Sequence, residues 1–133
     1  MTIGQVAKTA GVGIETIRFY EKEGLIEKPA RRASGYREYG DAVIPRLRFI
    51  RRAKELGFTL REIKELLALR VQHTASCGRV KEQAEAKIAD INAKVQSLRR
   101  MKRALVKLTD ACDERAPTSQ CPILEALDRN HGL

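Results

Sequence analysis

Long apolar runs are missing from this 133-residue chain, and their absence limits where the protein can act. No stretch approaches the ~20 apolar residues that a membrane-spanning helix needs. The segment MTIGQVAKTAGV at the start is too polar for a secretory signal peptide. We therefore expect a cytoplasmic protein with no membrane partner, built as one modest domain or as a small domain with an extension.

Catalytic constellations are missing as well. The sequence contains no recognisable Ser/His/Asp set, no pair of carboxylates typical of a catalytic cleft, and no glycine-rich phosphate loop. These absences predict a binding protein and not an enzyme.

Cysteine is scarce, but its positions are informative. There are three, Cys77, Cys112 and Cys121. An odd number without a signal peptide argues against a disulfide framework and for reduced thiols with a metal or redox role. Because thiolates are soft donors, a three-cysteine site favours Hg(II), Pb(II), Cd(II) or Cu(I) over Mg²⁺ or Ca²⁺.

The interval between the first two cysteines has the pattern of one long amphipathic helix over residues 78–111. Cys77 and Cys112 are 35 residues, or five heptads, apart, which places them about 50 Å from each other along a straight helix. If two such helices paired antiparallel about a midpoint near Lys94 and Val95, Cys77 of one chain would lie beside Cys112 and Cys121 of the other. The apolar stripe between the thiols contains Ala84, Ile91, Leu98 and Leu105, with Ile88 and Val95 in the complementary phase.

Acidic residues are sparse in the window from Lys28 to Lys54, which has nine basic residues and only two acidic ones. A concentrated cationic patch in a non-repetitive segment indicates a polyanionic partner, most simply nucleic acid. A solubilising face, or a DNA-packing protein without sequence preference, is the alternative.

The first 70 residues read as a compact helical head. A short helix over residues 3–9, a small-residue turn over 10–13 and a helix over 14–23 form a helix-turn-helix pattern, with Gly24 ending the second helix and Leu25 folding back over its end. Residues 28–39 are predicted to form a basic hairpin, or wing.

Two more helices complete the head. The third is expected over residues 41–56, with Asp41 as its N-cap and a buried stripe of apolar residues. The fourth follows a capping box of Thr59 and Glu62. The buried stripe of the third helix is Val43, Ile44, Leu47, Ile50 and Ala53.

We divide the chain into residues 1–70, a DNA-binding head; 71–111, a linker and dimerisation helix; and 112–133, a metal-binding loop followed by a short helix. That last helix is predicted to begin at Pro122, since proline is favoured at the first helical position.

Several of these segments together resemble the MerR family of transcriptional regulators. The matching segments are Thr2-Ile-Gly-Gln-Val-Ala, Gly11-Val, Glu15-Thr-Ile-Arg-Phe-Tyr-Glu, Gly24-Leu-Ile, Gly35-Tyr-Arg-Glu-Tyr and Leu56-Gly-Phe-Thr-Leu-Arg-Glu-Ile. The resemblance covers essentially the whole chain. It implies a mainly α fold, with a winged helix-turn-helix head, a long antiparallel coiled-coil dimerisation helix, and a short C-terminal metal-binding loop and helix.

The three cysteines and the run Cys121-Pro122-Ile123-Leu124 resemble the mercury-responsive branch of that family. The resemblance implies a homodimer on operator or promoter DNA that represses without metal. It also implies that Hg(II) is bound by Cys77 of one subunit and Cys112 and Cys121 of its partner, and that the metal-bound regulator distorts the DNA so that RNA polymerase can open it. A Pb(II)- or Cd(II)-responsive relative and a thiol redox sensor remain alternatives.

For the DNA contacts, we expect Thr16, Arg18 and Tyr20 on the second helix to touch the operator, with Arg18 the best candidate for a base edge. On the wing we expect the same of Arg31, Arg32 and Arg37. Tyr39 either reaches a phosphate or packs beneath the wing.

Overall fold

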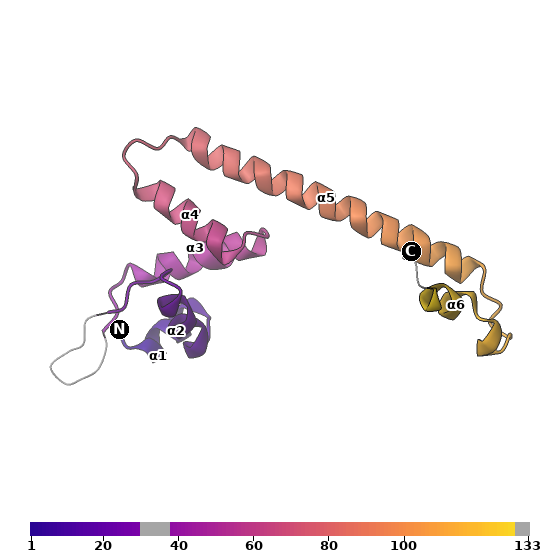
Figure 1. Cartoon of the computed structure of the whole chain (residues 1–133). Coiled ribbons are helices and arrows are strands. Elements are labelled where there is room, and N and C mark those ends of the chain that lie inside the picture. The colour runs from indigo at the N-terminus through magenta and orange to yellow at the C-terminus, as the bar shows by residue number, and fades with distance from the viewer. Residues whose placement is uncertain (30–37, 130–133) are drawn as a thin grey trace. The chain divides into compact units, whose positions relative to one another are not determined.

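The computed structural model describes residues 1–29 and 38–129, and Figure 1 shows the order of its elements. The predicted mainly α fold is confirmed. The described residues form six α-helices and one short 3-10 helix: α1 (Ile3–Ala10), α2 (Ile14–Lys22), α3 (Val43–Glu55), α4 (Leu60–Val71), α5 (Cys77–Asp110), η1 (Thr118–Gln120) and α6 (Pro122–Asp128). Of these helices, none combines the length and the apolar character needed to cross a membrane.

Two compact units make up the chain, Met1–Gln83 and Ala84–Leu133, and the division falls inside α5. The three-part division at residues 70/71 and 111/112 stays a prediction.

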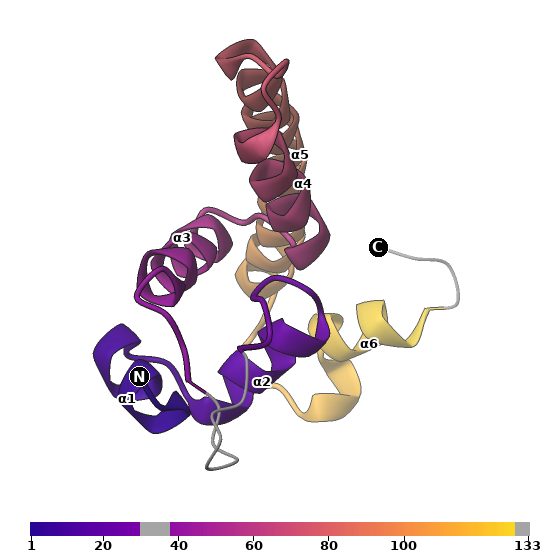
Figure 2. The ribbon, with the colours of Figure 1, turned by 90° about the vertical axis from the view of Figure 1, so that its left-hand side faces the viewer.

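The first unit is built around one hydrophobic core. In it α1 packs against α2 and α3, while α3 also packs against α4, and Figure 2 shows α1, α2 and α3 from the end of the head. The side chains that are fully enclosed in this core are Val6, Ile17, Leu25, Leu47, Ile50 and Ile63. All five residues predicted for the buried stripe of α3 are buried, because an apolar spacing of three and four places them on one helix face.

The turn after α2 forms as predicted. Gly24 takes a left-handed φ of 79°. Its N–H donates to the Glu21 carbonyl at 3.1 Å and the Leu25 N–H donates to the Tyr20 carbonyl at 2.9 Å, which together make a Schellman cap. Leu25 is buried over the helix end. This cap fixes the direction in which the chain leaves α2.

The start of α3 differs from the prediction. The helix begins at Val43 with Ala42 at the N-cap position, and no side chain among the described residues caps it. The Val43 N–H donates to the Gly40 carbonyl and the Ile44 N–H to the Asp41 carbonyl, each at 3.3 Å. Asp41 as a side-chain N-cap was therefore wrong, because a backbone turn already satisfies these amides.

The start of α4 agrees with the prediction. The Glu62 N–H donates to the Thr59 hydroxyl at 3.2 Å, and the Thr59 N–H donates to the Glu62 carboxylate at 2.8 Å. This reciprocal pair is the predicted capping box. Gly57, with a φ of 94°, makes the turn between α3 and α4.

The second unit contains most of α5 and the C-terminal segment. The long helix begins at Cys77, one residue earlier than predicted, and runs without interruption for 34 residues. Pro122 occupies the first turn of α6 with Cys121 at the N-cap position, as the sequence indicated.

Candidate nucleic-acid interface and metal-binding residues

The second helix of the head carries the residues predicted to read DNA. Thr16 is partly buried and Arg18 is exposed on α2. Gly13 precedes the helix without a side-chain cap among the described residues, and the N-terminus of a helix favours anions. An exposed guanidinium one turn further on suits the same polyanion.

Tyr20 and Tyr39 lie in the core and not on the surface. Tyr20 is 6% exposed and Tyr39 is 3% exposed. The Tyr39 hydroxyl donates a hydrogen bond to the Glu21 carboxylate, which is itself buried on α2. Of the two roles considered for Tyr39, packing is the one that the structure shows, and the DNA contacts of Tyr20 and Tyr39 stay predictions.

Tyr39 also ties the chain start to the segment that follows residue 37. The Met1 amino group donates to the Tyr39 carbonyl at 2.9 Å, and the Tyr39 N–H donates to the Met1 carbonyl at 2.7 Å. One residue thus connects the chain start, α2 and the segment that follows residue 37. The predicted wing contacts Arg31, Arg32 and Arg37 lie outside the described residues.

The rest of the cationic window lies mainly along the exposed side of α3. All of its basic residues that the structure describes are exposed: Lys28, Arg46, Arg48, Arg51, Arg52 and Lys54. Arg51 forms an ion pair with Glu55 at 3.4 Å, and the Lys54 ammonium lies 6.0 Å from the centre of the Tyr20 ring. The remaining positive charge faces solvent, as a polyanion-binding surface requires.

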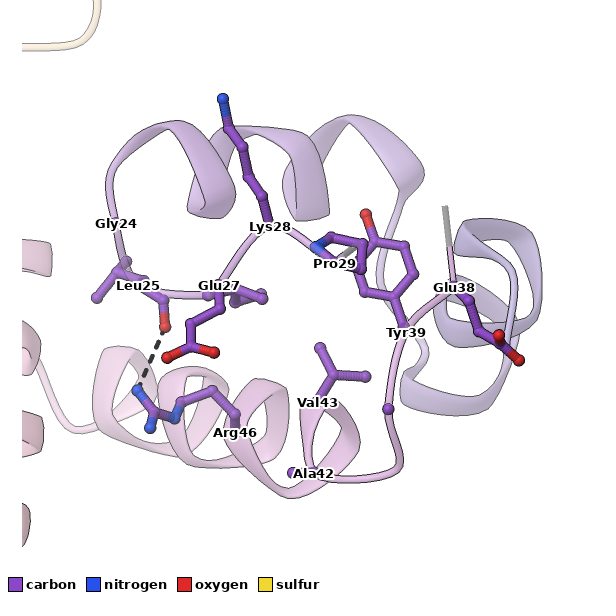
Figure 3. A pocket seen from close by; sticks show the side chains of 12 residues that line it. Gly24, Leu25, Glu27, Lys28, Pro29, Glu38, Tyr39, Ala42, Val43 and Arg46 are labelled. Carbon is purple, nitrogen blue, oxygen red and sulfur yellow. Dashed lines mark hydrogen bonds between the residues drawn. The ribbon is translucent and has the colours of Figure 1, made fainter. Parts of the chain in front are cut away.

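A hollow of about 550 Å³ separates the loop after α2 from the start of α3 (Figure 3). At one side the Arg46 guanidinium donates to the Leu25 carbonyl at 3.4 Å. Pro29 and Glu38, which flank residues 30–37, also line the hollow. The hydrogen bond between Arg46 and Leu25 holds the chain that leaves α2 against α3. The two helices that carry exposed cations are therefore joined by this polar contact as well as by the core.

The three cysteines are all free thiols. Cys77 is exposed in the first turn of α5, whereas Cys112 and Cys121 are partly buried beyond the end of that helix. The described residues of one chain bring together no group of three His, Cys, Asp or Glu side chains that could hold a metal ion. The assignment of these cysteines as metal ligands stays a prediction.

Local hydrogen bonds shape the segment that carries Cys112 and Cys121. The Cys112 N–H donates to the Thr109 carbonyl at 3.1 Å, and the Ala116 N–H donates to the Asp113 carbonyl at 2.9 Å. The Cys121 N–H donates to the Thr118 carbonyl at 3.2 Å at the end of η1. Each thiol therefore sits at a defined turn of the backbone.

The predicted helix seam is uncovered in the single chain. Leu98 is 62% exposed and Ile88 is 56% exposed, although both belong to the apolar stripe. The other large exposed apolar residues of α5 are Val80, Ile91, Val95, Met101, Leu105 and Val106. A contiguous exposed apolar stripe of this kind marks a protein interface.

Comparison with known proteins identifies the family. The model described as "MerR HTH family regulatory protein" matches residues 1–69, and the model described as "MerR, DNA binding" matches residues 44–108. The chain belongs to the MerR family. It is accordingly a helix-turn-helix transcriptional regulator that binds DNA, and not an enzyme.

Among MerR relatives, the "Mercuric resistance operon regulatory protein" of Bacillus cereus is 43% identical over 125 residues, covering 94% of this chain and 95% of the relative. The transcription regulator PbrR691 from Ralstonia metallidurans CH34, solved in complex with lead(II), is 40% identical with a TM-score of 0.85, covering 96% of this chain and 98% of that one. EcmrR, solved in the "EcmrR-DNA complex in EcmrR-RPo", is 27% identical with a TM-score of 0.60, covering 84% of this chain and 40% of that one.

Two features of this MerR head were not predicted from the sequence. The buried Glu21 was missed, although it lies four residues after the buried Ile17 and so on the same face of α2. The capping box of Thr2 and Gln5 at the start of α1 was also missed. Its signal, a threonine followed three residues later by glutamine, was present in the sequence.

Proposed function

We propose that this MerR-family member is a homodimeric, metal-responsive regulator whose sensed ion is Hg(II). Without metal it represses a mercury-resistance promoter. With Hg(II) bound it distorts the promoter DNA so that RNA polymerase can open it. The ion would be held by Cys77 of one subunit and by Cys112 and Cys121 of the other.

The observation that carries the proposal is the position of three free thiols at the two ends of one long helix, which has an exposed apolar stripe. The 34 residues of α5 separate Cys77 from the other two thiols, and a second copy packed antiparallel on the exposed stripe would bring the two sets together. The donor set is all sulfur, which suits a soft cation. The mercuric resistance regulator of Bacillus cereus, at 43% identity, supports mercury as that cation.

Pb(II) is the second candidate because PbrR691, of comparable identity, was solved with lead(II). Cd(II) suits the same thiolates. In either case the switch requires that the ion bind one conformation of the dimer more tightly than the other, since equal affinity would shift no equilibrium.

The direct test is a competitive titration of the reduced protein with Hg(II), Pb(II), Cd(II) and Zn(II), followed by thiolate-to-metal absorbance. We expect Hg(II) to bind most tightly at two ions per dimer, and Zn(II) to be weak because it favours four ligands. A ranking headed by Pb(II) or Cd(II) would assign the regulator to that ion. If no ion binds, and if peroxide added in the presence of a chelator lowers the mass of the protein by two protons, the protein is instead a redox sensor.

A mixing experiment tests whether the site is shared. The variant Cys77→Ser keeps only Cys112 and Cys121, and the double variant Cys112→Ser/Cys121→Ser keeps only Cys77. Neither should show the three-thiolate spectrum alone, whereas dimers refolded from the mixture should show it at one ion per mixed dimer. Failure of the mixture to recover it would overturn the shared site.

Transcription separates the sensing role from a structural one. Cys112→Ser should abolish metal-triggered transcription and leave operator binding nearly unchanged. Loss of both would make this cysteine structural.

A further inference from the structure

Charge is distributed unevenly along α5. From Ile91 to Thr109 the helix carries six basic residues and no acidic one. Its acidic residues before the last position, Glu82, Glu85 and Asp90, all precede that stretch. The N-terminal half is therefore mixed in sign and the C-terminal half is strongly cationic.

Two acids and two bases lie on one flank of the apolar stripe. Arg99 follows Glu85 by two heptads and Arg103 follows Glu82 by three, so these four residues share one helical face. All four are exposed. Glu85 and Arg99 each come one residue after a member of the stripe, Ala84 and Leu98 respectively, which places the flank next to the seam.

On the other flank, one acid lies between two bases. The Asp90 carboxylate lies 3.4 Å from the Lys87 ammonium and 3.2 Å from the Lys94 ammonium. This flank therefore does not have acids at one end of the helix and bases at the other.

We propose that the Glu82, Glu85, Arg99 and Arg103 flank fixes the antiparallel orientation of two α5 helices; the inference rests on the proposed homodimer. With the midpoint between Lys94 and Val95, Glu85 of one chain is level with residue 104 of the other, one residue from Arg103. Glu82 is then about 6 Å from the level of Arg103, within reach of an extended guanidinium side chain. The same contacts repeat at the other end of the dimer.

A parallel pair would reverse the outcome. In a parallel pair this flank would lie against the opposite flank of the partner helix, so the glutamates would not meet the arginines and Arg99 would lie beside the partner's Lys94, a like charge. The apolar stripe alone accepts both orientations, whereas the charged flank gains attraction only in the antiparallel one. Orientation matters for function, because only antiparallel helices bring Cys77 to the other subunit's Cys112 and Cys121.

Charge reversal in the full-length reduced protein tests the proposal. Glu82→Lys/Glu85→Lys and Arg99→Glu/Arg103→Glu should each raise the dimer dissociation constant, measured by analytical ultracentrifugation, about tenfold or more in low salt. The quadruple variant, which exchanges the signs, should return to within about threefold of the original value. High salt should reduce all of these differences.

The matched control is Arg100→Glu/Lys107→Glu, which makes the same charge change on the same half of α5 but on the face away from the seam. It should leave the dissociation constant within about threefold of the original. In a parallel dimer Glu82→Lys/Glu85→Lys would break no contact with the partner's arginines and would change the dissociation constant little. That result, or a quadruple variant as weak as the two doubles, would overturn the proposal, whereas an unaltered protein that stays monomeric would overturn the homodimer itself.

Discussion

At the scale of single residues, Tyr39 connects several parts of the head. Its backbone pairs with Met1 and its hydroxyl donates to Glu21 on the helix expected to read DNA. Because Tyr39 is the last residue of the predicted wing, one side chain links the wing's exit to the helix expected to read DNA. This makes it a positioning residue for the DNA-binding surface.

Removing the hydroxyl should therefore cost stability. In Tyr39→Phe the buried Glu21 carboxylate loses a donor, and we expect the free energy of unfolding to fall by about 1–3 kcal/mol in urea titrations. Glu21→Gln is the matched variant, since its amide oxygen can still accept from Tyr39, and its loss should be smaller. Equal stability of Tyr39→Phe and the original protein would contradict a role for this hydrogen bond.

Asp90 provides a pH test. Hydrogen bonds from Lys94 and Lys87 hold the pKa of this carboxyl below its ordinary value of 3.8. A lowered pKa contributes stability above pH 3.8 that is lost as the pH falls through the folded-state value. Asp90→Asn should therefore lower the melting temperature at neutral pH, with the difference from the original protein shrinking below about pH 4.

The control for Asp90→Asn is Asp128→Asn, which removes an exposed carboxylate from α6. Its melting temperature should track that of the original protein across the same pH range. A difference between Asp90→Asn and the original protein that persisted in acid would assign the effect to helix propensity and not to charge.

At the scale of elements, the helix ends decide how the head is shaped. Gly24 adopts a φ of 79°, where a Cβ atom is strained by about 1–2 kcal/mol. Gly24→Ala should reduce the free energy of unfolding by roughly that amount, and Gly24→Asn by less, since asparagine tolerates this conformation better.

Gly40→Ala is the matched control in the same unit, because a Cβ at Gly40 would meet nothing within 4 Å and its φ is not positive. Urea unfolding should show it close to the original protein. If Gly24→Ala were equally mild, the left-handed cap would contribute nothing measurable.

These elements also show what the sequence could predict. The caps at Gly24 and Thr59 were predictable because their residue types allow few other local conformations. Asp41 misled because the same residue favours both N-caps and turns, and the backbone of residues 40–42 formed a turn. Glu21 and Tyr39 were harder, since a buried acid is paired through the tertiary fold, which local spacing does not contain.

For the candidate site, the sequence predicted that one long helix separates Cys77 from the other two thiols, as the structure shows. The role of the three thiols as metal ligands stays a prediction. It also predicted the apolar stripe that α5 leaves exposed. The placement of Tyr20 and Tyr39 in the core was harder to predict from the sequence, because aromatic residues with a polar tip suit both buried and DNA-facing positions.

At the scale of the whole molecule, the uncovered stripe on α5 has a consequence for how such a regulator is used in a cell. In the proposed dimer no lone copy possesses a finished receptor, so the number of receptors follows the square of protein abundance when abundance is low. When the protein is scarce, the number of complete metal sites would then fall more steeply than the number of protein copies. A cell that kept few copies of the protein would respond less to traces of the metal ion, without any change in the affinity of the thiolates for that ion.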